Sequence, residues 1–75
     1  MPLFRKQTTE ERLALARKLV QAREDAGFLQ KDAAKELGIP PSVLCNVESG
    51  NRKIDASELK ALADLYEKPI EWFFN

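Results

Sequence analysis

The sequence predicts an all-α fold of five short helices, and three observations support this prediction. Apolar residues recur at spacings of three and four positions, which is the period of a helix that buries one face. Two stretches show the capping-box pattern, in which Thr or Asp is followed three residues later by Glu. Glycine and proline interrupt the chain at intervals that fit helices with tight connections. We expect residues 1–75 to form a single compact domain, with residues 1–7 as an N-terminal arm.

The first helix is expected to begin after Thr8 and to end at Gly27. Thr8 can accept a hydrogen bond from an amide of the first helical turn, and Glu11 can reach back to the backbone of Thr8. The apolar stripe that follows contains one charged residue, Arg23. Its apolar members are Leu13, Leu15, Ala16, Leu19, Val20, Ala22 and Ala26.

The second and third helices are short and close together in the chain. The spacing predicts a helix over 30–37 that Gly38 ends, and a helix over 41–49 that Pro41 starts and Gly50 ends. Their inward residues are expected to be Ala33, Ala34, Leu37, Leu44 and Val47. Two helices joined by a short turn that contains Gly are typical of the helix-turn-helix, whose second helix lies in the DNA major groove. From spacing alone, an ordinary corner between two helices fits about as well.

The last two helices follow a polar loop at positions 51–53. Asp55 and Glu58 form the second capping box, and the helix that they start continues to Tyr66. Its inward residues are expected to be Leu59, Leu62, Ala63 and Tyr66. Pro69 then starts a last turn or two over 70–74.

The composition excludes several classes of protein. The chain has 12 Lys and Arg, 12 Asp and Glu, no His and one Cys. Without His, the usual zinc sites and the His-based catalytic schemes lack their side chains, so we expect no enzyme, no metal and no cofactor. No apolar run approaches the roughly 20 residues that cross a bilayer, and no signal peptide is visible. We therefore expect a cytoplasmic protein without a membrane partner.

The net charge of zero conceals an uneven distribution of charge. Residues 1–53 hold ten basic and seven acidic side chains, a balance of +3, whereas residues 54–75 hold two basic and five acidic side chains, a balance of −3. A basic region is typical of a surface that faces a polyanion. Ordinary scatter of surface charge explains a difference of this size about as well.

Five segments, taken in order, carry a resemblance to a known family. Residues 22–27 read AREDAG, residues 30–39 read QKDAAKELGI and residues 44–52 read LCNVESGNR; the closing segments read LADLY at 62–66 and PIEWFF at 69–74. Across residues 13–75 the chain resembles the Cro/C1-type helix-turn-helix family, also called the XRE family. The resemblance implies a five-helix fold like that of the lambda repressor, with a central helix-turn-helix. For most members it also implies a homodimer on a palindromic operator in double-stranded DNA.

Arg23 and Glu48 match an arginine and a glutamate that form a structural ion pair in this family. Arg23 lies on the mostly apolar face of the first helix, where a charge without a partner would cost several kcal/mol. A carboxylate at Glu48 would repel a DNA phosphate if it faced one. We therefore expect both residues to hold the fold together rather than to contact DNA.

Other matched positions imply a DNA-binding surface. Gln30 would hold a phosphate at the start of the second helix. On the third helix, Ser42 and Asn46 would read base edges, and Val43 would pack on a thymine methyl group. The residues expected to bind DNA are Gln30, Lys31, Pro41, Ser42, Val43, Asn46, Asn51, Arg52 and Lys53. For the loop residues among them, simple solvation is an equal alternative.

The chain departs from the family pattern at both helix starts. Leu29 stands where a Thr, Ser or Asn cap is usual, and Pro40 and Pro41 remove two backbone donors from the start of the third helix. Such a surface predicts weak DNA affinity, readout through DNA shape, or a reading helix that has changed toward binding protein. Cys45 is interpreted as a small side chain in preference to a thiol switch.

Three consecutive aromatic residues close the chain. Trp72, Phe73 and Phe74 are more large side chains than so short a helix is expected to bury in 75 residues. One or two should pack against Leu62 and Tyr66, and the rest predict an exposed apolar patch that serves as a dimer contact, with residues 1–4 of a partner. The alternative is that Phe4 and Phe74 cover one another within one chain.

These observations favour a sequence-specific, DNA-binding transcriptional regulator that acts as a small dimeric repressor of prophage, restriction-control or antitoxin type. It would read a palindromic operator through the major groove. The alternative is a protein-interaction module, an antitoxin or adaptor that binds a partner such as a toxin and binds DNA weakly or not at all. Neither hypothesis requires an enzyme.

Overall fold

The computed structural model describes residues 9–74 and confirms the all-α fold class. The elements within this range are α1 (Thr9–Asp25), α2 (Gln30–Leu37), α3 (Pro41–Glu48), α4 (Ala56–Tyr66) and the 3-10 helix η1 (Ile70–Phe74). The predicted fifth helix is thus a 3-10 helix rather than an α-helix. It is only five residues long and begins with the N–H of Trp72 donating to the carbonyl of Pro69 at 3.0 Å, the spacing of 3-10 bonding.

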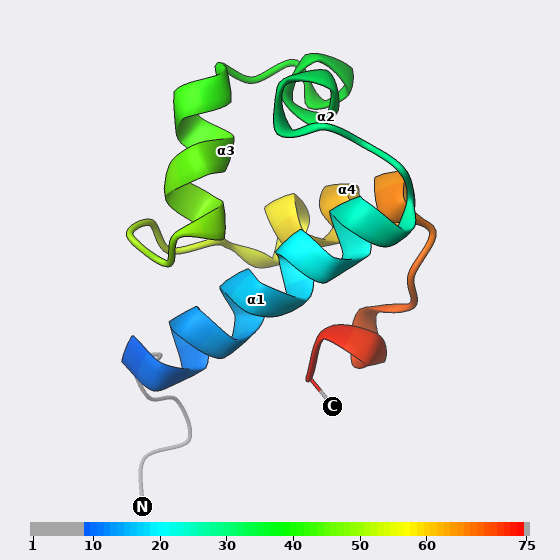
Figure 1. Ribbon diagram of the computed structural model, residues 1–75. Helices are drawn as coiled ribbons and strands as arrows, with labels where there is room; N and C mark the ends of the chain where they lie inside the picture. The colour runs from blue at the N-terminus through cyan, green and yellow to red at the C-terminus, as the bar shows by residue number, and fades with distance from the viewer. Residues whose placement is uncertain (1–8, 75) are drawn as a thin grey trace, which may run out of the picture.

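The helix α1 is the centre of the fold. It crosses the middle of the molecule, with α2 and α3 on one side and η1 on the other (Figure 1), and it packs against α3, α4 and η1. Its buried residues are Leu15, Ala16, Leu19 and Ala22. Leu13 stays 38% exposed and Ala26 lies beyond the helix end, so the predicted inward positions of these two residues were wrong. Thr8 of the first capping box and the arm at 1–7 lie outside the described residues.

Small side chains bring α2 and α3 close together. Ala33 and Ala34 on α2 are 0% exposed, and on α3 Leu44 and Val47 are buried in the same core. Because alanine projects only a methyl group, the two short helices can approach closely and share a single apolar interior. From α4 the core receives Leu59, Leu62, Ala63 and Tyr66, as the helical stripe predicted.

The capping box at the start of α4 is confirmed. The Asp55 side chain accepts from the Glu58 N–H at 2.8 Å, and the Glu58 side chain accepts from the Asp55 N–H at 3.0 Å. These bonds satisfy two amides that have no partner inside the helix. The bond from the Glu58 amide also holds the pKa of the Asp55 carboxyl below its ordinary value.

The three closing aromatic residues take three different positions. Phe73 is 3% exposed in the core, which corrects its prediction as a dimer contact, because its ring is covered within its own chain. Trp72 is half-buried and packs edge-on against Phe73, with the ring centres 5.1 Å apart. The ammonium groups of Lys18 and Lys68 lie 4.5 and 4.6 Å from the centre of its ring. Phe74 alone of the three points to solvent, with 65% of its surface exposed.

Candidate nucleic-acid interface

A tight turn of three residues connects α2 to α3. Gly38 ends α2 in the left-handed conformation, with φ of 70°, where the absence of a Cβ avoids a steric penalty. The N–H of Ile39 donates back to the carbonyl of Ala34 at 3.0 Å, and the Ile39 side chain packs on the core. Pro40 is extended and Pro41 opens α3. Two short packed helices joined in this way form a helix-turn-helix.

A buried ion pair fixes α3 against α1. Arg23 Nε donates to Glu48 Oε2 at 2.7 Å, and Arg23 Nη1 donates to the carbonyl of Phe28 at 2.7 Å. The two charged side chains are only 13% and 5% exposed. The hydrogen bond to Glu48 raises the pKa of Arg23, against the opposing effect of burial. Arg23 and Glu48 therefore hold the helix-turn-helix on α1 and point away from solvent.

Gln30 extends this network into α2. Its Nε2 donates to the second carboxylate oxygen of Glu48 at 2.9 Å, and the side chain is half-buried. One N–H of the side-chain amide is thus occupied inside the protein, which leaves one N–H for an outside acceptor. Gln30 is positioned by Glu48 and is not a freely moving surface residue.

The outward face of α3 is built from short side chains. Pro41, Ser42 and Asn46 are exposed, as are two residues not included in the predicted DNA-binding set, Cys45 and Ser49. Positions 42, 45, 46 and 49 lie on one face of a helix because they are three and four residues apart. The Ser49 hydroxyl donates to the carbonyl of Asn46 at 3.2 Å, so it caps the helix end. Short side chains allow the backbone of α3 to approach a ligand closely.

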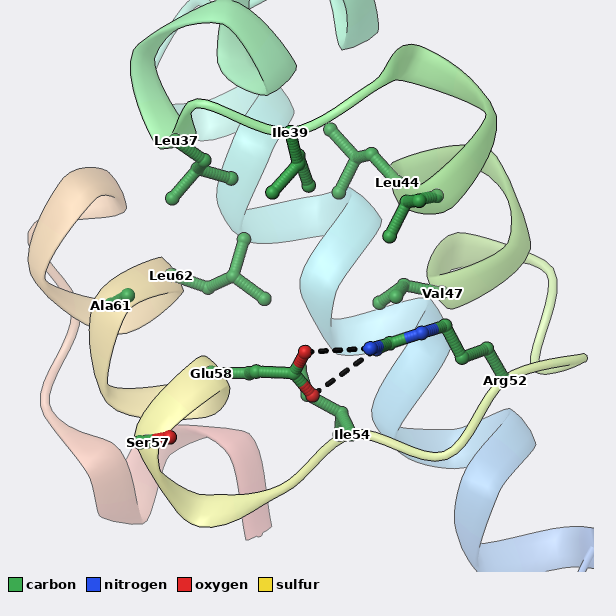
Figure 2. A pocket seen from close by; sticks show the side chains of 11 residues that line it. Leu37, Ile39, Leu44, Val47, Arg52, Ile54, Ser57, Glu58, Ala61 and Leu62 are labelled. Carbon is green, nitrogen blue, oxygen red and sulfur yellow. Dashed lines mark hydrogen bonds and ion pairs between the residues drawn. The ribbon is translucent and has the colours of Figure 1, made fainter.

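Val43 lies three residues before Asn46, at the edge of the face that carries Ser42 and Asn46. It is half-buried and lines an apolar pocket of about 230 Å³ between α3, α4 and the two connections beside them. Figure 2 shows Leu37, Ile39, Leu44, Val47 and Leu62 around the same pocket. The contact of Val43 with a thymine methyl group stays a prediction, since this side chain is half-buried beside the pocket and keeps part of its surface exposed.

The loop after α3 presents three exposed polar residues, Asn51, Arg52 and Lys53. Arg52 is not free: its Nη1 and Nη2 donate to the two carboxylate oxygens of Glu58 at 3.1 and 2.7 Å (Figure 2). The pair joins the loop to α4 and lowers the pKa of Glu58 while raising that of Arg52. Among the described residues, no hydrogen bond or ion pair partner is recorded for the side chains of Asn51 and Lys53.

The starts of α2 and α3 have no side-chain caps. Leu29 and Pro40 hold the cap positions, neither side chain accepts a hydrogen bond, and Leu29 is 61% exposed. The first amides of α2 are left for an outside acceptor such as a phosphate, next to the exposed ammonium group of Lys31. The sequence predicted these missing caps correctly, because neither Leu nor Pro has a side-chain hydrogen-bond acceptor.

Residues 9–74 contain neither a membrane-spanning helix nor a cluster of metal-ligating side chains. No helix in this part of the chain has both the length and the apolar character of a membrane span. Nor do three or more His, Cys, Asp or Glu side chains gather there in a way that could hold a metal ion.

The fold and this site define a class of protein, and comparison with known sequences agrees with it. A family model described as Helix-turn-helix matches residues 19–73, which is most of the chain. The chain belongs to the Cro/C1-type, or XRE, helix-turn-helix family. Among curated proteins it is similar to the HTH-type transcriptional regulator ImmR of Bacillus subtilis (strain 168), with 39% identity over 63 residues. That match covers 84% of this chain and 50% of the relative, so the chain spans about half the length of the relative.

Sequence reasoning missed the roles of Glu58 and of the residues beside Asn46. Glu58 was interpreted only as a capping residue, although an acidic side chain six positions after Arg52 was a signal for a pair across the loop. Ser49 and Cys45 could have been found by extending the period of the helix from Ser42. Leu44 and Val47 are buried in the core, and their burial determines which residues of α3 point outward.

Proposed function

We propose that this chain is a sequence-specific DNA-binding transcriptional regulator that acts as a small dimeric repressor. The outward face of α3 enters the major groove of a palindromic operator, and the dimer places two such helices about one helical turn apart. The start of α2 and the loop at 51–53 contact the sugar-phosphate backbone on either side. The place of action is the cytoplasm, with double-stranded DNA as the partner.

One observation carries the proposal: an ion pair joins the inner side of the helix-turn-helix to α1, while its outer face is exposed. Arg23 and Glu48 hold α3 from inside, and Ser42 and Asn46 are exposed on the other side. Asn46 can donate to N7 and accept from N6 of adenine, and Ser42 can donate or accept at either kind of base pair. Membership of the family and the regulator name of the relative support the same function.

Selection from a random-sequence duplex library tests the proposal. We expect a palindromic consensus with adenine at the positions that Asn46 reads. Asn46→Ala should lose about 1–3 kcal/mol at the selected site and the adenine preference with it. Asn51→Ala is the matched control, because a loop residue on the backbone should weaken binding to all sequences equally. Absence of any sequence preference above non-specific binding at moderate salt would disprove the proposal.

The second candidate function is a protein-interaction module, and exposed apolar residues favour it. Leu29 and Phe74 are 61% and 65% exposed, so each presents a large apolar side chain to solvent. A toxin or other protein partner that covered either residue would be held by apolar contact. Its affinity would change little with salt, whereas DNA affinity falls steeply as salt rises. A titration at several salt concentrations therefore separates the two candidates.

A further inference from the structure

We propose that Glu58 is a positioning residue that holds Arg52 with one edge of its guanidinium group open to a DNA phosphate. This inference rests on the proposed function, and it assigns to the start of α4 a part in preparing a backbone contact. Glu58 itself touches no DNA.

The open edge follows from the hydrogen bonds that Arg52 already makes. Nη1 donates to Glu58 Oε1 at 3.1 Å and to the carbonyl of Lys53 at 3.2 Å, and Nη2 donates to Glu58 Oε2 at 2.7 Å. A guanidinium has five N–H donors, so Nε–H and the second N–H of Nη2 remain. No other described residue accepts from these two groups. They lie along the same edge and form a fork that matches two oxygens of a phosphate.

The carboxylate that holds Arg52 is itself fixed. Glu58 Oε1 also accepts from the Asp55 N–H at 3.0 Å, so the capping box sets the position of the carboxylate. In Figure 2 the pair bridges from α4 to the loop that follows α3, beside the apolar pocket. These contacts favour one orientation of the Arg52 guanidinium beside the end of α3.

Two possible roles of Glu58 predict opposite effects of its removal on DNA affinity. If Glu58 were only a surface anion, its removal would strengthen DNA binding by relieving repulsion from phosphates. If it positions Arg52, its removal weakens binding, because the freed arginine must lose side-chain entropy at the phosphate. The pair is 40% and 36% exposed, so solvent screens its contribution to stability and either sign can be measured on a folded protein.

A double-mutant cycle on DNA binding tests the inference. Wild type, Arg52→Lys, Glu58→Ala and the double variant are titrated with a mixed-sequence duplex of about 30 base pairs, which accommodates two half-sites. The sequence is immaterial because a phosphate contact does not depend on it. We expect each single variant to weaken binding about three- to tenfold, as for one lost hydrogen bond, and the double variant to show no further loss. Arg52→Ala should in addition reduce the salt slope by about 1.

Two matched variants complete the design. Asp64→Ala removes the anion of another exposed ion pair on α4, Lys60–Asp64 at 3.3 Å, and should not weaken binding. Glu58→Gln keeps an acceptor for the Asp55 amide, so it separates loss of positioning from any loss of the folded state; it should weaken binding in the same direction. The inference would be overturned if Glu58→Ala and Glu58→Gln bind DNA as well as wild type or more tightly. It would also be overturned if the losses of DNA affinity in the cycle are additive. Either result would leave the proposed function standing. Wild type without salt-dependent DNA binding would overturn the proposed function as well.

Discussion

The phenol of Tyr66 is a buried polar group whose hydroxyl makes no hydrogen bond to another described residue. The residue is 3% exposed, and its ring lies 6.1 Å from that of Phe28. Burial, assisted by the charge of Glu48 and opposed by that of Arg23, raises the pKa of Tyr66 to about 12. The phenol is therefore neutral at physiological pH, and its hydroxyl loses solvation without a compensating bond.

We predict that Tyr66→Phe stabilises the fold. Removing the hydroxyl relieves a desolvation penalty of about 1 kcal/mol, which corresponds to a rise in melting temperature of about 4–8 °C for a domain of this size. Thermal unfolding followed by circular dichroism measures the change. Tyr66→Leu is the control, since it also removes the ring that packs in the core and should destabilise the protein. A lower melting temperature for Tyr66→Phe would mean that the hydroxyl has a partner.

At the scale of elements, α2 and α3 begin with residues that cannot cap a helix. The last element, η1, follows Pro69 directly and is too short for regular α-helical bonding. By contrast, α4 begins with a complete capping box. At α2 the uncapped first amides can therefore donate to an anionic ligand. At α3 Pro41 has no N–H and the N–H of Val43 donates to the carbonyl of Pro40 at 3.0 Å, so fewer amides remain for such a ligand.

Leu29→Ser should stabilise α2. A serine at this cap position can accept from an amide of the first turn, which contributes about 0.5–2 kcal/mol. Leu29→Ala removes the same exposed apolar surface without adding an acceptor, so the difference between the two variants isolates the cap. Urea denaturation midpoints measure it. Equal midpoints for serine and alanine would show that the start of α2 gains nothing from a cap.

Local signals in the sequence predicted the elements well. Gly38, which follows an alanine-rich stripe, correctly predicted the end of α2, and the pair Asp55 and Glu58 correctly predicted the start of α4. Such signals can be read from the sequence because glycine caps and capping boxes involve only a few neighbouring residues. The helical period also predicted that Leu44 and Val47 turn toward the core, as observed. The burial of Phe73 rather than Phe74 could not be predicted in this way. It depends on which neighbouring elements supply the rest of the core, and no window of a few residues contains that information.

At the scale of the whole molecule, Phe74 is the largest exposed apolar side chain in the described part of the chain. With Phe73 in the core and Trp72 covered by two lysines, the predicted dimer contact narrows to Phe74 and its surroundings on η1. A 75-residue chain buries a modest core, so a dimer would also add to its stability.

We predict that the protein is dimeric at micromolar concentration and that Phe74→Ser makes it monomeric. Sedimentation equilibrium measures the molar mass directly. Leu29→Ser is the matched control, since it removes a comparably exposed apolar side chain at the start of α2, outside η1, and should leave the dimer intact. A wild-type protein that sediments as a monomer would remove the dimer from the proposed function.

Trp72 is the only tryptophan in the sequence, and its position gives the protein a built-in optical probe. The indole contacts the ammonium groups of Lys18 of α1 and Lys68 beside η1, so its emission depends on whether η1 is packed against the rest of the fold. Detachment of η1 would expose the ring to water and separate it from two quenching or polarising charges, with no label required. Because η1 packs on α1 and α4, this signal follows the closing helix separately from events at the face of α3.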